Sequence, residues 1–438
     1  MNHAAQPQHE TRSTRLARMA TMASLVFAGE AVFVLPFQIA RVFRPTVLRV
    51  FHLSNTALGN MFAAYGVIAM LSYFPGGAIA DRFPARKLLT ISLLLTGCGG
   101  LYMHRIPSSG GLTLLFAFWG LTTILLFWAA LIRATREWGG ALSQGAAFGV
   151  LDGGRGLLAA VLASLATFAF ALLLPDAHAV DDAQRRAALQ DVIAIYTIAT
   201  FAGAALVWTF VPERAVAAPT EAVGFRALAH VLPVMRMPTV WLQAMTVVCA
   251  YCAYKGVDDY TLFAAQAYGF DEVQAARLGA LSAWVRPFAA LAAGLLADRT
   301  TPSRVCTLCF AMLIIGYAIF GFGTPDSNVL WLLYANVLFT CVALFGLRGV
   351  YFALLQQGAV PTQVTGTAVG LISVIGYTPD VFMAPLMGWL LDRSPGAAGH
   401  QHVFVFLLGT SALGMFAVAA LERAGMVTRV LSESAVDR

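Results

Sequence analysis

The chain has 438 residues, of which 59% are hydrophobic and only 11% are charged. Soluble domains carry about 25% charged residues, so the composition excludes an ordinary soluble protein and predicts a chain that crosses a membrane many times. The formal net charge of +6 does not indicate a nucleic-acid partner, because the basic residues follow the short loops between apolar segments, as in membrane proteins.

Apolar segments follow one another along the whole chain. A transmembrane helix needs about 20 apolar residues, and twelve such segments can be placed. We expect them at residues 19–39, 58–80, 88–103, 112–132, 145–174, 192–211, 239–263, 275–297, 305–322, 329–347, 367–391 and 403–421. The other residues suffice for loops and tails only, so the expected fold class is an all-α membrane protein.

The less apolar segments divide the chain into parts. We expect a polar tail at residues 1–18, a six-helix bundle at 19–211, a connector at 212–238, a second six-helix bundle at 239–422 and a second tail at 423–438. Basic residues are more frequent on the side that holds the tails and the connector, and basic loops stay in the cytoplasm. Both termini are therefore predicted to be cytoplasmic.

One loop occurs twice. The segment GAIADRFPARK begins at Gly77, between the second and third spans, and GLLADRTTPSR begins at Gly294, between the eighth and ninth. In each copy small residues allow two helices to approach closely, and an Asp-Arg pair follows. This repetition, at matching places in two sets of six spans, predicts two related halves.

The loop resembles the signature G-x-x-x-D-R-x-G-x-R-K of the major facilitator superfamily, although Pro84 stands where that family usually has Gly. The resemblance covers the whole chain and implies the major facilitator fold, in which twelve helices form two pseudo-symmetric bundles. It also implies secondary active transport by alternating access and no enzymatic activity. The residues expected to latch one conformation are Gly77, Asp81, Arg82, Arg86, Asp298 and Arg299.

Three charged residues are predicted to lie near the middle of the membrane. A charge there costs about 2.5 to 3.5 kcal/mol, which makes it a functional candidate. A rise of about 1.5 Å per residue places Glu30, Arg155 and Arg286 at this depth. In the superfamily the substrate site lies between the halves, so the two Arg are expected to face each other and bind an anion. Alternatively the protein neutralises each Arg itself, and Asp152, one turn before Arg155, is placed to do so.

Carboxylates in the spans are candidates for proton coupling. Glu30 is the first, because a buried carboxylate can load and release a proton, and Asp380 and Asp152 follow. The alternative for Glu30 is a permanent pairing with a mid-membrane Arg. Three aromatic residues are candidates for substrate contact, although such side chains more often pack helices together: Tyr65, Trp284 and Tyr377.

Four polar residues gather at the outer end of the seventh span. These are Tyr254, Lys255, Asp258 and Asp259. Lys255 is expected to pair with the two Asp, which lie three and four residues further on a helix. The group is interpreted as an outer gate or as ordinary charges at the membrane interface.

The sequence predicts no metal site and no cofactor. The pairs Cys249-x-x-Cys252 and Cys306-x-x-Cys309 have metal-ligand spacing but lie in apolar segments without His partners. Every His is terminal, in a loop or at the end of a span, so no buried His relay is expected. The chain also lacks a phosphate-binding G-x-x-x-x-G-K-[ST] motif.

These features predict a secondary active transporter of a small polar organic solute. The two mid-membrane Arg favour an organic anion with proton coupling. The alternative is proton-driven efflux of a drug or siderophore, or transport of a zwitterionic or cationic solute, because carboxylates outnumber cations around the expected cavity. The strong preference for Arg over Lys is typical of a GC-rich bacterial genome and indicates a bacterial inner membrane. The expected partners are the solute, protons and the lipid bilayer, and the protein is expected to be a monomer.

Overall fold

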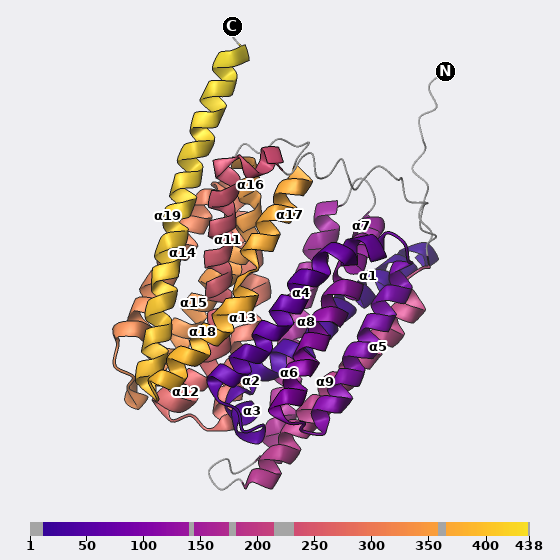
Figure 1. Ribbon diagram of the computed structural model, residues 1–438, viewed down its shortest axis with the longest axis vertical. Coiled ribbons are helices and arrows are strands. Elements are labelled where there is room, and N and C mark those ends of the chain that lie inside the picture. Colours follow the sequence, from indigo (N-terminus) through magenta and orange to yellow (C-terminus); the bar gives the residue numbers. More distant parts are fainter. Residues whose placement is uncertain (1–11, 140–143, 175–180, 214–231, 358–364, 437–438) are drawn as a thin grey trace.

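The computed structural model describes residues 12–139, 144–174, 181–213, 232–357 and 365–436. Within these ranges every regular element is a helix. Ten helical segments are long and apolar enough to cross a membrane, and α5 and the joined pair α11 and α12 pack beside them (Figure 1). Together they form the twelve spans of the predicted all-α fold.

The first half of the chain supplies six spans. In chain order its helices are α1 (Arg12–Phe33), η1 (Val34–Gln38), α2 (Ile39–Val42), α3 (Arg44–Val50), α4 (Asn55–Ala80), α5 (Ala85–His104), α6 (Ser109–Gly120), η2 (Leu121–Trp128), α7 (Ala129–Gly139), α8 (Gln144–Leu173) and α9 (Asp182–Phe210). The first span joins α1, η1 and α2, and the fourth joins α6, η2 and α7. The elements η1 and η2 are π-helical.

The second half supplies the other six. Its helices are α11 (Pro238–Gly256), η3 (Val257–Asp259), α12 (Tyr260–Tyr268), α13 (Glu272–Arg299), α14 (Pro302–Phe322), η4 (Ser327–Val329), α15 (Leu330–Val350), η5 (Tyr351–Ala353), α16 (Leu354–Gln357), α17 (Thr365–Gly376), α18 (Pro379–Arg393) and α19 (Ala397–Val436). The seventh span is interrupted by the 3-10 turn η3, and the eleventh is divided into α17 and α18.

The two ends of the chain are more helical than predicted. Residues 423–438 were expected to form a tail, but α19 continues to Val436 and projects beyond the bundle (Figure 1). At the other end α1 begins at Arg12, within the tail expected at 1–18. Residues 1–11 and 437–438, and residues 214–231 of the expected connector, lie outside the described ranges.

Local sequence explains where several of these helices begin. Asp181 and Asp271 each accept a hydrogen bond from the backbone N–H three residues later, and the Gln at that position bonds back. This reciprocal arrangement satisfies two amides that would otherwise lack partners. In the eleventh span Pro379 restarts the helix as α18, because proline is well tolerated in a first helical turn. The restart places Asp380 at the break between α17 and α18.

Among the described residues, two pairs of helices make the most extensive contacts between the halves. In one, α4 packs against α18, and in the other α8 packs against α13. Figure 1 shows the halves converging near α2, α3 and α18 and separating toward α7 and α17. We call the end of the bundle that holds Arg12 and Val436 the terminal side, and the opposite end the far side.

The space around individual glycines shows the same difference between the far side and the terminal side. On the far side, a Cβ at Gly59 of α4 would collide with the backbone of α18, and one at Gly388 of α18 would collide with the backbone of α4. Nearer the centre, a Cβ at Gly66 would collide with the backbone of Asp380. On the terminal side, a Cβ at Gly149 or Gly294 would meet open space. The far side is therefore closed by contacts between backbones, while the terminal side is spread.

Candidate functional site

Four charged side chains from both halves meet between α1, α8 and α13. Oε2 of Glu30 lies 3.6 Å from Nε of Arg155 and 3.7 Å from Nη1 of Arg286. Oδ1 of Asp152 lies 3.8 Å from Nη1 of Arg155 and 3.4 Å from Nη2 of Arg286. We call Glu30, Asp152, Arg155 and Arg286 the central cluster. It carries two positive and two negative formal charges.

The side chains of the central cluster differ in their contacts and in their exposure. Arg155 donates a 2.9 Å hydrogen bond from Nε to the carbonyl of Gly29, and its guanidinium lies 5.6 Å from the rings of both Phe33 and Trp128. Glu30 is only 7% exposed, and its Oε2 is buried without a hydrogen-bond partner. The side chain of Asp152, in contrast, is 63% exposed. The cluster thus combines a fixed cation, a buried carboxylate and an accessible carboxylate.

Both sequence-based interpretations of the two Arg are visible in this geometry. Arg155 and Arg286 come together across the interface between the halves, as expected from their depth. Each also lies beside protein carboxylates, and Glu30 contributes to this pairing as much as Asp152 does. In this conformation each guanidinium is therefore matched by protein carboxylates.

A second pair lies inside the C-terminal half. Nζ of Lys255 lies 2.9 Å from Oδ1 of Asp380, and the hydroxyl of Tyr251 donates to the same carboxylate at 3.1 Å. Lys255 is 2% exposed and approaches the faces of Phe37 and Phe62 from the other half at 4.9 and 5.5 Å. The predicted pairing of Lys255 with Asp258 and Asp259 is wrong, because the 3-10 turn η3 directs those carboxylates elsewhere.

Asp258 instead joins the halves on the far side. Its Oδ1 accepts a 2.5 Å hydrogen bond from Nε of Arg41, and its backbone carbonyl accepts a 3.0 Å bond from Arg44. Arg44 also binds Asn55, whose amide donates to Asp392 of α18. We call these five residues the far-side lock.

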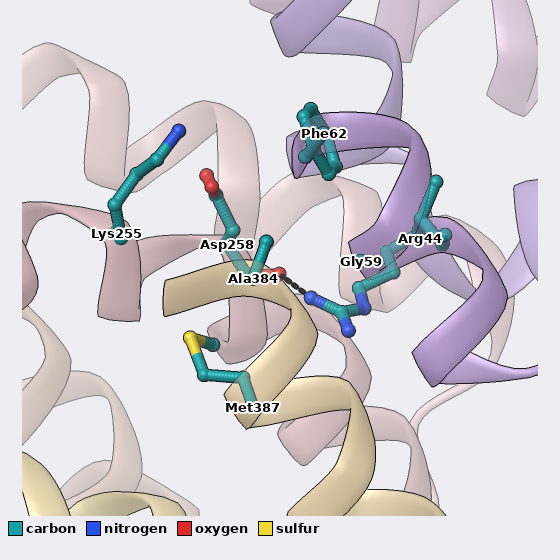
Figure 2. Close-up of a pocket in the computed structure, with 8 residues that line it drawn as sticks. Arg44, Gly59, Phe62, Lys255, Asp258, Ala384 and Met387 are labelled. Atoms are coloured by element: carbon teal, nitrogen blue, oxygen red, sulfur yellow. Dashed lines mark hydrogen bonds between the residues drawn. The ribbon is translucent and has the colours of Figure 1, made fainter. Parts of the chain in front are cut away.

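Figure 2 shows a pocket beside the far-side lock, with Arg44 reaching toward Asp258 from the opposite half. Gly59, Phe62, Lys255 and Met387 contribute to its walls. The space holds about one water molecule, so no organic solute fits there in this conformation. At the residues predicted to form an outer gate, Asp258 is bound by Arg41 and Arg44, which the sequence interpretation did not include.

Tyr254 lies between the far-side lock and the centre. Its hydroxyl accepts a 3.0 Å hydrogen bond from Nη1 of Arg41, and the Arg41 guanidinium lies 4.7 Å from its ring. The same ring also contacts Arg348, whose guanidinium carbon is 3.8 Å from the ring centroid. Tyr254 therefore contacts a cation from each half.

Asp259 binds a histidine that the sequence interpretation missed. Oδ2 of Asp259 lies 2.7 Å from Nδ1 of His400, and Nε2 of His400 lies 3.0 Å from Oε1 of Gln266. The side chains of Asp259 and His400 are fully buried. His400 lies near the beginning of α19, at the end of a span as expected, but it is buried and bound on both ring nitrogens, which the sequence did not indicate. Asp259 belongs to the core of the C-terminal half, outside the far-side lock.

Arg348 is the second residue that was missed. The tenth span was expected to end at residue 347, which left Arg348 outside it. The helix α15 continues to Val350 and brings Arg348 between Tyr254 and Tyr251, whose ring centroid is 5.5 Å away. Arg348 also lies within electrostatic range of Asp152 and Arg155.

The three aromatic candidates take different positions. Trp284 donates a 2.9 Å hydrogen bond from Nε1 to Ser164 of the other half. Tyr377 lies at the break between α17 and α18, with its ring 5.1 Å from that of Tyr251. Tyr65 is 3% exposed and bonds to Thr123 at 2.7 Å within the first half. Trp284 and Tyr377 therefore lie at the interface and the centre, whereas Tyr65 lies within the packing of one bundle.

The predicted latch residues lie on the terminal side. Asp81, Arg82, Asp298 and Arg299 are exposed there, and the position of a Cβ on Gly77 has no atom within 4 Å. The loop after α4 is held by a residue outside the motif, Arg133 of α7, which donates hydrogen bonds to the carbonyls of Ala80 and Phe83.

Arg86 connects the same loop to the end of the sixth span. It binds Glu213 and lies 4.7 Å from the ring of Trp208. Nζ of Lys87 lies 2.7 Å from the same carboxylate. These two cations lower the pKa of Glu213, with the hydrogen bond from Lys87 as the largest cause.

A family model described as the Major Facilitator Superfamily matches residues 26–379. The chain belongs to this superfamily. It is similar to the inner membrane protein YqcE of Escherichia coli (strain K12), with 29% identity over 412 residues that cover 92% of this chain and 93% of that protein. This superfamily member is accordingly a secondary transporter and not an enzyme.

Solved structures share its fold. A mutant of the nucleoside transporter NupG superposes with a TM-score of 0.71 at 13% identity, covering 92% of this chain and 99% of that one. A bacterial homologue of the human lysosomal transporter Spinster, in an inward-facing and occupied conformation, gives 0.69 at 16% identity, covering 95% and 98%. At these identities the similarity establishes the major facilitator fold alone.

Proposed function

We propose that this transporter carries a small organic anion together with a proton across a bacterial inner membrane, as a monomer, by alternating access. The observation that carries the proposal is the position of Glu30, a buried carboxylate within 4 Å of an Arg from each half. Both termini are assigned to the cytoplasm. The terminal side is then the cytoplasmic side, and the conformation described here is open inward.

The central cluster suggests how proton and anion are coupled. With Glu30 ionised, the four charges of the central cluster sum to zero. A further anion would then be buried without a positive charge to balance it, which is unfavourable. A proton on Glu30 leaves the cluster with one net positive charge and frees donors on both guanidiniums. Guanidinium groups bind carboxylate or phosphate through paired hydrogen bonds. Binding of the anion restores neutrality, so proton and anion enter together.

Charge balance also links binding to the change of conformation. Arg155 belongs to one half and Arg286 to the other, so an anion held by both draws α8 and α13 together. An empty cluster with Glu30 ionised is likewise neutral and can be enclosed again. A half-loaded cluster carries a net charge, and its enclosure costs several kcal/mol. Asp380, paired with Lys255, supplies a second carboxylate that can take part in proton transfer.

The exposed loops on the terminal side fit the same cycle. Within the described part of the chain, no hydrogen bond or ion pair joins Asp81, Arg82, Asp298 or Arg299 to the other half. We assign them, with Gly77 and Arg86, to a latch that forms when this side closes and the outer side opens. The far-side lock must then separate.

One observation favours a second candidate, a zwitterionic solute. The side chain of Asp152 is 63% exposed and lies 3.4 Å from Arg286. A solute with an ammonium group and a carboxylate can bind Asp152 and Arg286 at once. Such a solute needs no proton on Glu30, so its uptake would be independent of a pH gradient.

Transport into proteoliposomes tests the proposal. The labelled panel consists of gluconate, glucarate, 6-phosphogluconate, glutamate and glutamine, with and without an imposed pH gradient. We expect gradient-stimulated uptake of an acid, abolished in Arg286→Gln. In Glu30→Gln the gradient should have no effect while exchange of internal for external solute continues. Arg277→Gln, an exposed position on the same helix α13, is the matched control and should behave like the wild type.

The outcomes separate the candidates. Gradient-independent uptake of glutamine alone would favour the zwitterion. Gradient-stimulated uptake that survives in Glu30→Gln would contradict the role of Glu30. Failure to move any member of the panel would contradict the assignment to small organic acids.

A further inference from the structure

We infer that Arg348 is a second anion-binding point and that the substrate carries two acidic groups. The inference rests on the proposed function, since it specifies the class of anion that the transporter moves. Arg348 has no role in the coupling of proton and anion through Glu30.

Arg348 is a cation without a carboxylate. Its guanidinium lies 3.8 Å from the centroid of Tyr254 and 5.5 Å from that of Tyr251, and its Nη1 is buried without a hydrogen-bond partner. In the part of the chain that the structure describes, no carboxylate lies within 4 Å of it. The aromatic faces support the cation, but a face cannot accept the in-plane hydrogen bonds that the edge of a guanidinium offers.

The other central cations all have carboxylate partners. Arg155 and Arg286 share Glu30 and Asp152, and Lys255 pairs with Asp380. Among the described residues, the central cluster and the Lys255–Asp380 pair are thus each neutral, and Arg348 beside them adds one positive charge. Arg348 as a whole is partly buried, but its Nη1 is fully buried, and buried polar atoms normally have a partner. We expect the missing partner to arrive with the substrate.

The location of Arg348 fits a role beside the central cluster. Its helix α15 packs against α13, the helix of Arg286. A Cβ at Gly349, the residue after Arg348, would lie 3.2 Å from the carbonyl oxygen of Ala290, one turn beyond Arg286. One small molecule can therefore contact both regions. Its first acidic group would bind Arg155 and Arg286 after Glu30 accepts a proton, and its second would bind the free edge of Arg348.

The chemistry of this point defines the ligand class. The planar fork of Arg recognises carboxylate and phosphate through two parallel hydrogen bonds, and the rings of Tyr251, Tyr254 and Tyr377 form an aromatic surface beside it. We assign the substrate to short organic acids with two carboxylates, or with one carboxylate and one phosphate.

Three members of the panel test this assignment as a matched series. Gluconate has one carboxylate, glucarate has two, and 6-phosphogluconate has a carboxylate and a phosphate on the same six-carbon chain. We expect the wild type to prefer at least one doubly acidic member over gluconate by about tenfold or more in KM. The better of glucarate and 6-phosphogluconate identifies the second group.

Substitution of Arg348 should remove this preference selectively. In Arg348→Gln we expect the KM of the doubly acidic member to rise about tenfold or more toward that of gluconate, with the KM of gluconate unchanged. Arg348→Lys keeps the charge but not the fork and should retain part of the preference. Arg277→Gln should leave all three values as in the wild type.

Several results would overturn the inference. These are a wild type with equal KM values across the series, an Arg348→Gln variant that keeps the preference, and one that weakens all three acids alike. The wild-type comparison decides the matter even if Arg348→Gln fails to fold. Gradient-driven uptake of gluconate, with no preference for the doubly acidic members, would refute the anion-binding point at Arg348 and leave the proposed function intact. Inactivity toward the whole panel would refute both proposals.

Discussion

Arg41 and Asp258 are 217 positions apart in the chain, and their side chains lie 2.5 Å apart in the structure. The pair joins the end of the first span to the interruption of the seventh. Arg44 reinforces it by bonding to the Asp258 carbonyl. Since all three groups lie at the far side, the contact must break whenever that side opens, and it contributes to the balance between the two conformations.

Arg41→Gln is therefore expected to favour the conformation that is open on the far side. Loss of one partner from a partly buried pair costs about 1 to 3 kcal/mol, which shifts the ratio of the two states about tenfold or more. Spin labels at His52 and Asn328, exposed far-side positions on different halves, report the distance between the halves. The measurement uses a background in which exposed Cys98 is replaced by Ser.

Arg49→Gln provides the comparison. Arg49 also joins the halves, through Glu272 at 3.1 Å, but its side chain is 64% exposed. Exposed pairs contribute about 0 to 1 kcal/mol, so the label distances should change little. An equal response of the two variants would show that the burial of Arg41 has no special role.

Gly59→Leu should prevent closure of the far side. A Cβ at Gly59 would already collide with the backbone of Ala384 and Pro385, and a larger side chain forces α4 away from α18. We expect the transport rate to fall about tenfold or more, because two backbones in a packed interface cannot move apart without loss of packing. The variant should still give a normal gel-filtration profile. Gly110→Leu is the control, since its Cβ would meet open space. Normal transport by Gly59→Leu would contradict the assigned role of this contact.

The buried pair of Asp259 and His400 is expected to stabilise the C-terminal half. Asp259→Asn should lower the unfolding temperature by several degrees, because breaking a buried pair costs about 3 to 5 kcal/mol. Thermal unfolding in detergent of Asp259→Asn, His400→Gln and the double variant forms a cycle. We expect the double variant to lose clearly less than the sum of the single losses, and strict additivity would argue against a direct interaction.

Glu213 offers a test of pH dependence. Lys87 and Arg86 lower the pKa of Glu213 in the folded state. Its ion pairs therefore stabilise the folded state fully above the ordinary Glu pKa of about 4.3, and this stabilisation is lost as pH falls through the lowered pKa. The difference in unfolding temperature between wild type and Glu213→Gln should therefore stay constant from pH 8 to pH 5. A difference that declines between pH 7 and pH 5 would contradict the lowered pKa.

The fold could be predicted because its signals are local in the sequence. Each span shows as an apolar segment of about the thickness of a bilayer, and the repeated Asp-Arg loop relates the halves. Counting residues from the span ends also placed Glu30, Arg155 and Arg286 at one depth, and the structure brings them together.

The partners of the charges could not be predicted in the same way, because they depend on tertiary contacts. Lys255 was expected to pair within its own helix, but the 3-10 turn η3 turns Asp258 toward Arg41. Arg348 lay outside the expected tenth span, which ended at residue 347, but α15 continues to Val350 and includes it. His400 lay before the expected beginning of the twelfth span at residue 403, and its burial depends on contacts with Asp259, Phe263 and Gln266 that come from the seventh span.

The π-helical segment η2 sets the rotational phase of the fourth span. A π turn bonds each residue to the fifth rather than the fourth along, so η2 contains more residues than regular turns of the same height. Trp128 beside Arg155 and Arg133 beside the loop after α4 both depend on that surplus. Deletion of one residue from Leu121–Trp128 would rotate α7 by about 100°. The site and the loop would lose their contacts together, without any change in side-chain chemistry.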